Sequence, residues 1–197
     1  MRIHKIIIVI SFCFLTGSSF AQNGEGETGQ YHKFSVYAGA GPSYFINNLV
    51  ILKDQVNNFQ YAVSARLMWE PQHSFVALGF ETGYYRLYTV TSTYPNPKAD
   101  VSNSSVPLMF VVSMKFSKKF YANWAMGQSI TFNKVSNTDS SYNFNANTWS
   151  LSDFSATFGY RFVQKPKISY SAELKGYYSS GYENATIALL FIVGFRL

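Results

Sequence analysis

The feature that most constrains this chain is an alternation of large apolar residues with small or polar ones. It is clearest over 120–132, where Phe, Ala, Trp, Met, Gln, Ile and Phe occupy the even positions and Tyr, Asn, Ala, Gly, Ser and Thr the odd ones. A period of two places successive side chains on opposite faces of a β-strand. The same alternation predicts eight strands, at about 33–45, 59–70, 74–89, 104–117, 119–133, 149–163, 167–179 and 185–197.

The connections between these segments alternate in length. Short ones fall at 71–73, 118 and 164–166, and longer polar ones at about 46–58, 90–103, 134–148 and 180–184. Short turns at one end and long loops at the other are typical of outer-membrane barrels. Each segment is long enough to cross a bilayer as a tilted strand, which needs roughly 9–11 residues. We therefore predict an all-β fold, an eight-stranded antiparallel up-and-down transmembrane β-barrel.

The charged residues indicate which face of the strands points inward. Nine of them fall on the face opposite the large apolar side chains: Arg66, Glu70, Glu81, Lys115, Asp153, Arg161, Glu173, Lys175 and Arg196. Seven glycines share that face and would leave room for large side chains in a narrow lumen: Gly39, Gly41, Gly79, Gly83, Gly127, Gly159 and Gly194. Because an unpaired buried charge is very costly, we expect a lumen plugged by ion pairs across it.

The members of this charge network expected near mid-depth are Arg66, Glu81, Glu173 and Lys175. The alternative is that some of these charges lie at the rims in water, where ion pairs contribute little.

Aromatic residues on the apolar face are expected to form two lipid-facing belts. The belt near the tight turns comprises Trp69, Phe116, Phe120, Phe162, Tyr170 and Phe195. The belt near the long loops comprises Tyr44, Tyr61, Tyr84, Tyr88, Phe132, Trp149 and Tyr178. Bilayer interfaces favour aromatic side chains at these two heights. The alternative is that they form the core of a β-sandwich.

The N-terminal residues read as an export signal. A basic start is followed by an apolar run at 6–15 and a small-x-small sequence ending at Ala21, the pattern of a secretory signal peptide. We expect residues 1–21 to be that signal, 22–30 a flexible lead-in, and 31–197 the barrel domain. Cys13, the single cysteine, would leave with the signal, so the mature chain would contain no disulfide.

The chain as a whole resembles the small eight-stranded outer-membrane barrels, which include the OmpX type, the OmpA transmembrane domain and the outer-membrane beta-barrel family of Bacteroidetes. The residues that carry the resemblance are the leader ending at Ala21, the stretch 105–108 (SVPL) and the final stretch 188–197. The resemblance implies a Gram-negative outer membrane, with lipid and lipopolysaccharide as surroundings. Both termini are expected in the periplasm, because the number of strands is even. The resemblance also implies recognition of the C-terminal strand by the barrel assembly machinery, with Phe195 and Leu197 as the assembly signal.

The sequence offers little for chemistry. Some eight-stranded barrels modify lipid A, which requires a nucleophile and a base within reach. Here His73 and Ser74 are adjacent in a tight turn, which says nothing about such geometry. There is no histidine pair at metal-ligand spacing and no Asp-rich loop. We therefore predict a non-enzymatic protein with no catalytic residue, cofactor or metal.

The remaining surface for recognition is the set of long loops, which could contact an unknown surface ligand. The net charge of +6 is not gathered into a basic stripe, because no run exceeds Lys118–Lys119, so nucleic acid is not an expected partner. We expect an envelope-structural or surface-interaction role through these loops. One alternative is a narrow passive channel for small solutes. The other is a secreted, soluble, lipocalin-like barrel that binds a hydrophobic ligand, which would need the apolar face inside and the charges outside.

Overall fold

A computed structural model describes residues 32–46, 55–71, 74–91, 99–137, 143–181 and 184–197. The expected signal peptide and lead-in lie outside these residues. The strands are β1 (His32–Ile46), β2 (Val56–Asn57), β3 (Phe59–Pro71), β4 (Val76–Thr91), β5 (Ala99–Lys115), β6 (Phe120–Asn137), β7 (Phe144–Gln164), β8 (Ile168–Ser179) and β9 (Asn184–Arg196). Over the described ranges, the chain has no helix of the length and apolarity needed to cross a membrane.

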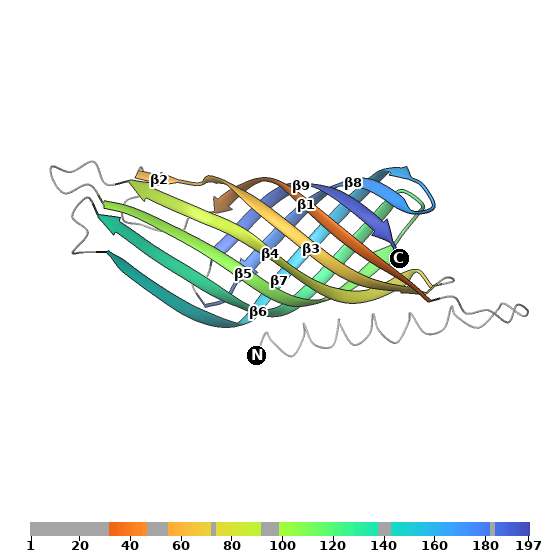
Figure 1. Cartoon of the computed structure of the whole chain (residues 1–197), viewed down its shortest axis with the longest axis horizontal. Helices are drawn as coiled ribbons and strands as arrows, with labels where there is room; N and C mark the ends of the chain where they lie inside the picture. The colour runs from red at the N-terminus through yellow and green to blue at the C-terminus, as the bar shows by residue number, and fades with distance from the viewer. Residues whose placement is uncertain (1–31, 47–54, 72–73, 92–98, 138–142, 182–183) are drawn as a thin grey trace, which may run out of the picture. The chain divides into compact units, whose positions relative to one another are not determined.

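The strands close into one antiparallel barrel (Figure 1). Each long strand pairs with the next along the chain, and β9 returns to pair with β1, as Phe195 opposite Val36 shows. The two-residue β2 continues the line of β3, since both pair with β4. With β2 and β3 counted as one interrupted strand, the barrel has eight strands, and the predicted up-and-down topology is confirmed.

The strands on one side of the barrel are longer than the alternation predicted. Ala99 of β5 pairs with Asn137 of β6, and Lys134 of β6 pairs with Asn145 of β7. Much of the connections predicted at 90–103 and 134–148 is therefore strand (Figure 1). The physical reason is that backbone hydrogen bonds extend the sheet whatever the side chains are. The Asn- and Ser-rich tips lack the apolar alternation by which strands are recognised in a sequence.

Two register shifts alter which side chains point inward. One lies between Arg86 and Tyr88 in the β4–β5 pairing. As a result Tyr88, expected in the outward belt, packs against the buried Phe45 with ring centroids 5.0 Å apart. The other shift lies in the β6–β7 pairing, where Ser129 pairs with Ser150 and Gly127 with Asp153. A β-bulge of this kind adds residues to one strand and re-aims its side chains.

The exterior of the barrel is apolar and the interior carries the charges. At mid-strand, Leu174, Leu189 and Phe191 are 55%, 56% and 53% exposed. By contrast, seven of the nine charged residues assigned to the inner face are buried, while Lys115 and Arg196 are half-buried. This arrangement is the reverse of the one that the soluble, lipocalin-like alternative requires.

Candidate functional site

Four charged side chains meet inside the barrel at mid-height. Arg66 of β3 and Glu81 of β4 are paired across adjacent strands. Glu173 and Lys175 are successive inward-facing residues of β8, which reach them across the lumen. All four residues are at most 4% exposed. The structure thus brings together the four residues that the alternation placed near mid-depth.

The four groups form a neutral, linked set of ion pairs. The Arg66 guanidinium donates a hydrogen bond to Glu173, and the Lys175 ammonium donates one to Glu81. Arg66 Nε also lies 3.7 Å from Glu81 Oε2. Moving a charged group out of water into the protein interior costs roughly several kcal/mol. Each of these four groups therefore needs an oppositely charged partner in order to stay charged in the lumen.

Tyrosines extend the network along the lumen. The Tyr121 hydroxyl donates to Glu173 Oε1 over 2.6 Å. Tyr85 stacks on Tyr177, with ring centroids 4.6 Å apart, and the Tyr177 hydroxyl donates to Asp153 Oδ2 over 2.8 Å. The sequence reasoning did not assign these tyrosines to the site. Their strand parity carried the signal, because Tyr121 falls on the same face as Gly127.

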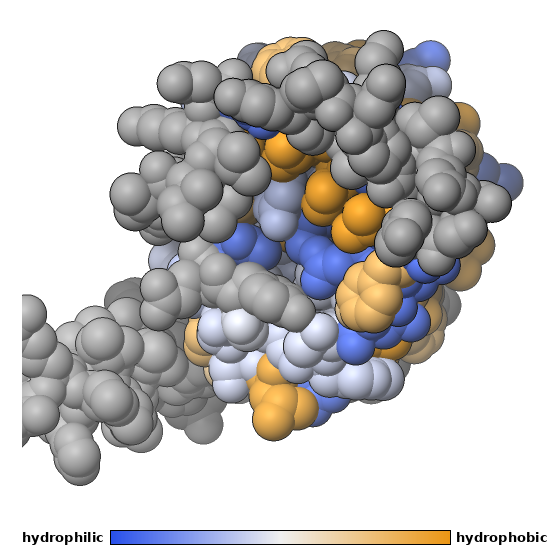
Figure 2. Space-filling view, turned by 90° about the vertical axis from the view of Figure 1, so that its left-hand side faces the viewer, coloured by the Kyte–Doolittle hydropathy of each residue, from blue (hydrophilic) through white to orange (hydrophobic). Residues whose placement is uncertain are grey.

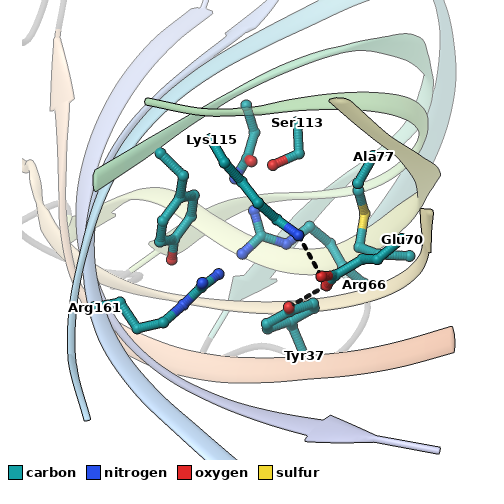
Figure 3. Close-up of a pocket in the computed structure, with 10 residues that line it drawn as sticks. Tyr37, Arg66, Glu70, Ala77, Ser113, Lys115 and Arg161 are labelled. Carbon is teal, nitrogen blue, oxygen red and sulfur yellow. Dashed lines mark hydrogen bonds and ion pairs between the residues drawn. The ribbon is translucent and has the colours of Figure 1, made fainter. Parts of the chain in front are cut away.

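A second ion pair lies toward the end of the barrel that carries the short turns. Glu70 Oε2 accepts a hydrogen bond from Lys115 Nζ over 2.5 Å, and Glu70 Oε1 accepts one from the Tyr37 hydroxyl. Figure 3 shows these side chains and Arg161 pointing into a common space. That cavity has a volume of about 10 Å³, which is room for about one water molecule.

Gly159 makes space for the ring of Tyr121, the tyrosine that bonds Glu173. A Cβ on Gly159 would clash with the ring of Tyr121, which lies beside it on the neighbouring strand. The hydroxyl of that ring is the one that bonds Glu173. A small residue at 159 is therefore what allows a large hydrogen-bonding one at 121.

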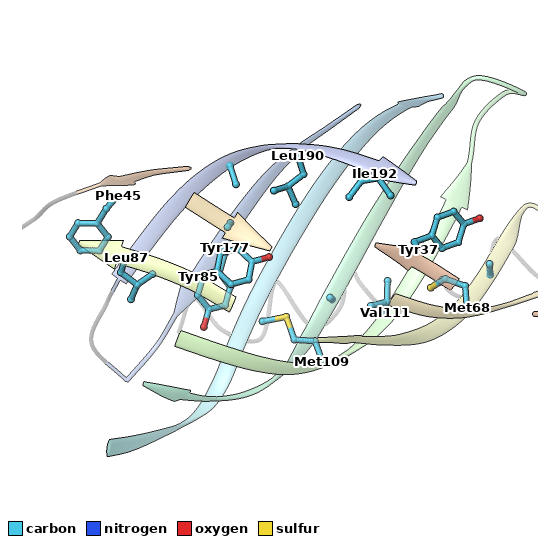
Figure 4. Packing of buried hydrophobic residues seen from close by; sticks show 14 residues of the cluster. Tyr37, Phe45, Met68, Tyr85, Leu87, Met109, Val111, Tyr177, Leu190 and Ile192 are labelled. Atoms are coloured by element: carbon cyan, nitrogen blue, oxygen red, sulfur yellow. The ribbon is translucent and has the colours of Figure 1, made fainter. Parts of the chain in front are cut away.

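The lumen contains apolar layers in addition to the predicted ion pairs. Buried apolar side chains occupy the lumen at several heights (Figure 4). Phe45 and Leu87 lie toward the end with the long connections, and Met68 and Val111 toward the other end. Viewed from the long-connection end, Figure 2 shows hydrophilic residues at the bottom of a hollow. Close packing of apolar layers next to ion pairs keeps water from those pairs.

The residues assigned to the aromatic belts face outward to different extents. Trp149 is 63% exposed and Phe116 62%. Six others are also exposed, namely Tyr44, Tyr61, Phe120, Phe162, Tyr178 and Phe195. The half-buried members are Trp69, Tyr84, Tyr88, Phe132 and Tyr170. The bulge in β7 lets Trp149 face outward although Asp153, an even number of residues away, is fully buried.

Only one residue of the His73–Ser74 pair is among those that the structure describes. His73 lies outside the described residues, and Ser74 Oγ accepts a hydrogen bond from the Val76 amide, 3.0 Å away, as a turn residue. The described residues contain no group of three or more histidine, cysteine or acidic side chains that could hold a metal ion.

Comparisons with known proteins relate this chain to others by fold. No family model matches the sequence, and no curated protein matches it. Among solved structures, the attachment invasion locus protein Ail of Yersinia pestis, in complex with the heparin analogue sucrose octasulfate, aligns with a TM-score of 0.51 at 12% identity. A major outer membrane protein from Thermus thermophilus aligns with a TM-score of 0.52 at 13% identity. Both alignments cover 84% of this chain and 99% of the other. The chain therefore has the fold of small outer-membrane β-barrels.

Proposed function

We propose that this chain is an integral outer-membrane barrel with a plugged lumen and a non-enzymatic role in envelope structure or surface interaction. The observation that carries the proposal is the apolar exterior around a charged interior. Exposed apolar area costs roughly 25 cal/mol per Å² in water. A bilayer removes that cost for side chains such as Leu189 and Phe191, each more than half exposed at mid-strand.

The packing inside the barrel supports a plug. The Arg66–Glu81–Glu173–Lys175 cluster crosses the lumen with its side chains buried. Solute passage would require these side chains to separate and to lose their partners. Separating buried charges in this way costs roughly several kcal/mol. A passive channel is therefore the less favoured role.

The proposed surroundings follow from the location. Outer-membrane lipids and lipopolysaccharide would contact the exterior, and Phe195 and Leu197 at the end of the last strand would serve as the assembly signal. The described chain begins at His32 and ends at Leu197, both at the end of the barrel with the short turns. We assign that end to the periplasm, because the long connections of such barrels are extracellular.

A surface-interaction role would fall on the long connections, which lie largely outside the described residues. Ail, which shares the fold, was solved with a heparin analogue. A sulfated glycan is accordingly a reasonable first probe for the loops of this chain.

The test of the location is the heat-dependent gel mobility of the protein from a washed outer-membrane fraction. Closed membrane barrels resist SDS until they are boiled. We expect the unheated protein to migrate differently from the boiled one and to be absent from the soluble periplasmic pool. Recovery in that pool without a mobility shift would overturn the proposal.

The channel alternative needs its own measurement. Purified protein in a planar bilayer should give no single-channel conductance above background if the lumen is plugged. Discrete current steps that scale with the amount of protein would instead establish the passive channel.

A further inference from the structure

We propose that the short-turn end of the barrel holds a binding site for a phosphate group. The site is an open hollow of about 520 Å³ between the β5–β6 turn and the β7–β8 turn. Its lining residues are Lys118, Lys119, Arg161, Phe162, Gln164, Lys165, Pro166 and Arg196. The proposal concerns the opposite end from the long loops, and it does not depend on the location proposed above.

The charges inside the barrel do not cancel at this end. Three of the acidic side chains of the inner face are paired with cations, and the fourth, Asp153, accepts hydrogen bonds from Tyr177 and Ser150. Two inner-face cations, Arg161 and Arg196, form no ion pair within the described residues. Both line the hollow, so the unbalanced positive charge is concentrated there.

The composition of the hollow strengthens this imbalance. Five of its eight lining residues are cationic and none is acidic. The ion pairs of the described chain include none of these five. Arg196 has a neutral neighbour instead: when the Gln164 amide nitrogen faces the Lys118 carbonyl, its oxygen accepts from Arg196 Nη2 over 3.0 Å. Five like charges around one hollow repel one another, and a bound anion would relieve that repulsion.

Arg161 is the strongest single indication of a ligand. It is 8% exposed, and its Nε has no hydrogen-bond partner. Its guanidinium lies 5.0 Å from the centre of the Tyr121 ring, and Figure 3 shows it pointing into the barrel. Glu70 is near enough to interact with it electrostatically, but Glu70 already binds Lys115 and Tyr37. A buried guanidinium normally has all its donors paired, and among the described residues this Nε has no acceptor.

The donors favour phosphate over a smaller anion. Arginine binds phosphate oxygens in a bidentate manner, and lysine adds point charges around them. Phe162 belongs to the lining and is 44% exposed, and Phe116 and Phe120 at the same end of the barrel are exposed as well. The hollow thus adjoins the apolar exterior, as a site for the headgroup of an anionic phospholipid would. A free phosphate-bearing solute offers the same chemistry from the aqueous side.

The experiment measures both sources on the folded protein. In neutral detergent micelles, inorganic pyrophosphate is titrated by isothermal calorimetry. In nanodiscs of phosphatidylcholine with phosphatidylglycerol, native mass spectrometry counts the anionic lipid retained by the barrel. The test variant is Lys118→Gln/Lys165→Gln, whose two side chains are exposed in turns. The matched control is Lys33→Gln/Lys134→Gln, which removes two exposed charges that do not line the hollow.

The proposal predicts saturable binding in at least one of the two measurements. A lysine near an anionic surface contributes about a fivefold change in affinity, so the test variant should bind about 25-fold more weakly. The control should bind like the unmodified protein. Arg161→Gln should lose binding as well, with its folded state verified by heat-dependent gel mobility.

Each outcome is informative. Binding of phosphatidylglycerol alone identifies a lipid site, and binding of pyrophosphate, alone or with the lipid, identifies a site open to solutes. Absence of saturable binding in both measurements would overturn the proposal, as would an equal loss in test and control variants. A failure of the location proposal would show in cell fractionation instead, which leaves pyrophosphate binding unaffected.

Discussion

The sharpest test of the lumen network is the substitution Glu173→Gln. It removes one charge from the Arg66–Glu81–Glu173–Lys175 cluster and keeps the volume of the side chain. Because glutamine fills the same space, the change opens no cavity for water. The Tyr121 hydroxyl can still donate to the amide oxygen at position 173. The substitution therefore isolates the charge.

The magnitude follows from the contacts. Glu173 is fully buried and is the direct partner of Arg66. Without its charge, two cations share Glu81 alone, and the cluster carries a net positive charge. Two unit charges about 4 Å apart interact by about 4 kcal/mol at the effective dielectric typical of proteins. Breaking a buried pair by removing one partner typically costs about 3–5 kcal/mol. We expect the free energy of unfolding to fall by that amount.

The assay is urea unfolding of the barrel in phospholipid vesicles, followed by tryptophan fluorescence. Trp124 and Trp149 are 62% and 63% exposed on the outer face, so their emission should change when the barrel leaves the bilayer. The slope with urea should stay unchanged, because the same surface is exposed on unfolding.

A double variant provides the control. Arg66→Met with Glu173→Gln restores neutrality, since Lys175 and Glu81 remain paired. It should recover a large part of the loss, and the two substitutions should couple strongly. The reasoning would be refuted by a loss below about 1 kcal/mol for Glu173→Gln, the range of exposed pairs. A double variant no more stable than the single one would refute it equally.

Three further predictions use the same preparations. Gly159→Ala should destabilise the barrel by about 1–3 kcal/mol, because the added Cβ would displace the Tyr121 ring. Gly176→Ala should be nearly neutral, because its added Cβ would meet only the Ala156 carbonyl, 3.9 Å away. Equal losses of stability in urea unfolding would contradict this prediction. Leu174→Arg, at an outward position halfway along β8, should lower the free energy of unfolding in vesicles by about 2–4 kcal/mol. Phe144→Arg, at the start of β7, should lower it much less. A similar loss at both sites would argue against the proposed orientation in the bilayer. Removing a buried ion pair as a unit, with Glu81→Ala and Lys175→Ala together, should raise planar-bilayer conductance above that of the unmodified barrel. An unchanged background current would contradict this prediction and show that the other lumen side chains suffice to block the passage of ions.

The sequence alone determined the architecture. Alternation at a period of two is a property of single strands, so it is readable without any knowledge of their neighbours. The face that carries Arg66 and Glu173 was assigned in this way, and those residues do point inward. The number of strands and their up-and-down order followed from the same pattern and from the connection lengths.

The tertiary structure decided the details that depend on pairing between strands. The bulges that turn Tyr88 inward and Trp149 outward are register shifts against a neighbour, which a period within one strand cannot show. The polar tips of β5, β6 and β7 are held by backbone hydrogen bonds that leave no side-chain signature.

Which charges meet was likewise a question of geometry across the lumen. The sequence placed both Arg161 and Lys175 on the inner face, but only closure of the barrel set their heights and neighbours. Closure gave Lys175 a buried carboxylate partner in Glu81. It left Arg161 at the short-turn end without an ion pair among the described residues, where it contributes to the lining of a hollow that includes no acidic residue. The alternation of side chains is a local property of the chain, whereas the pairing of charges depends on which strands the closed sheet brings together.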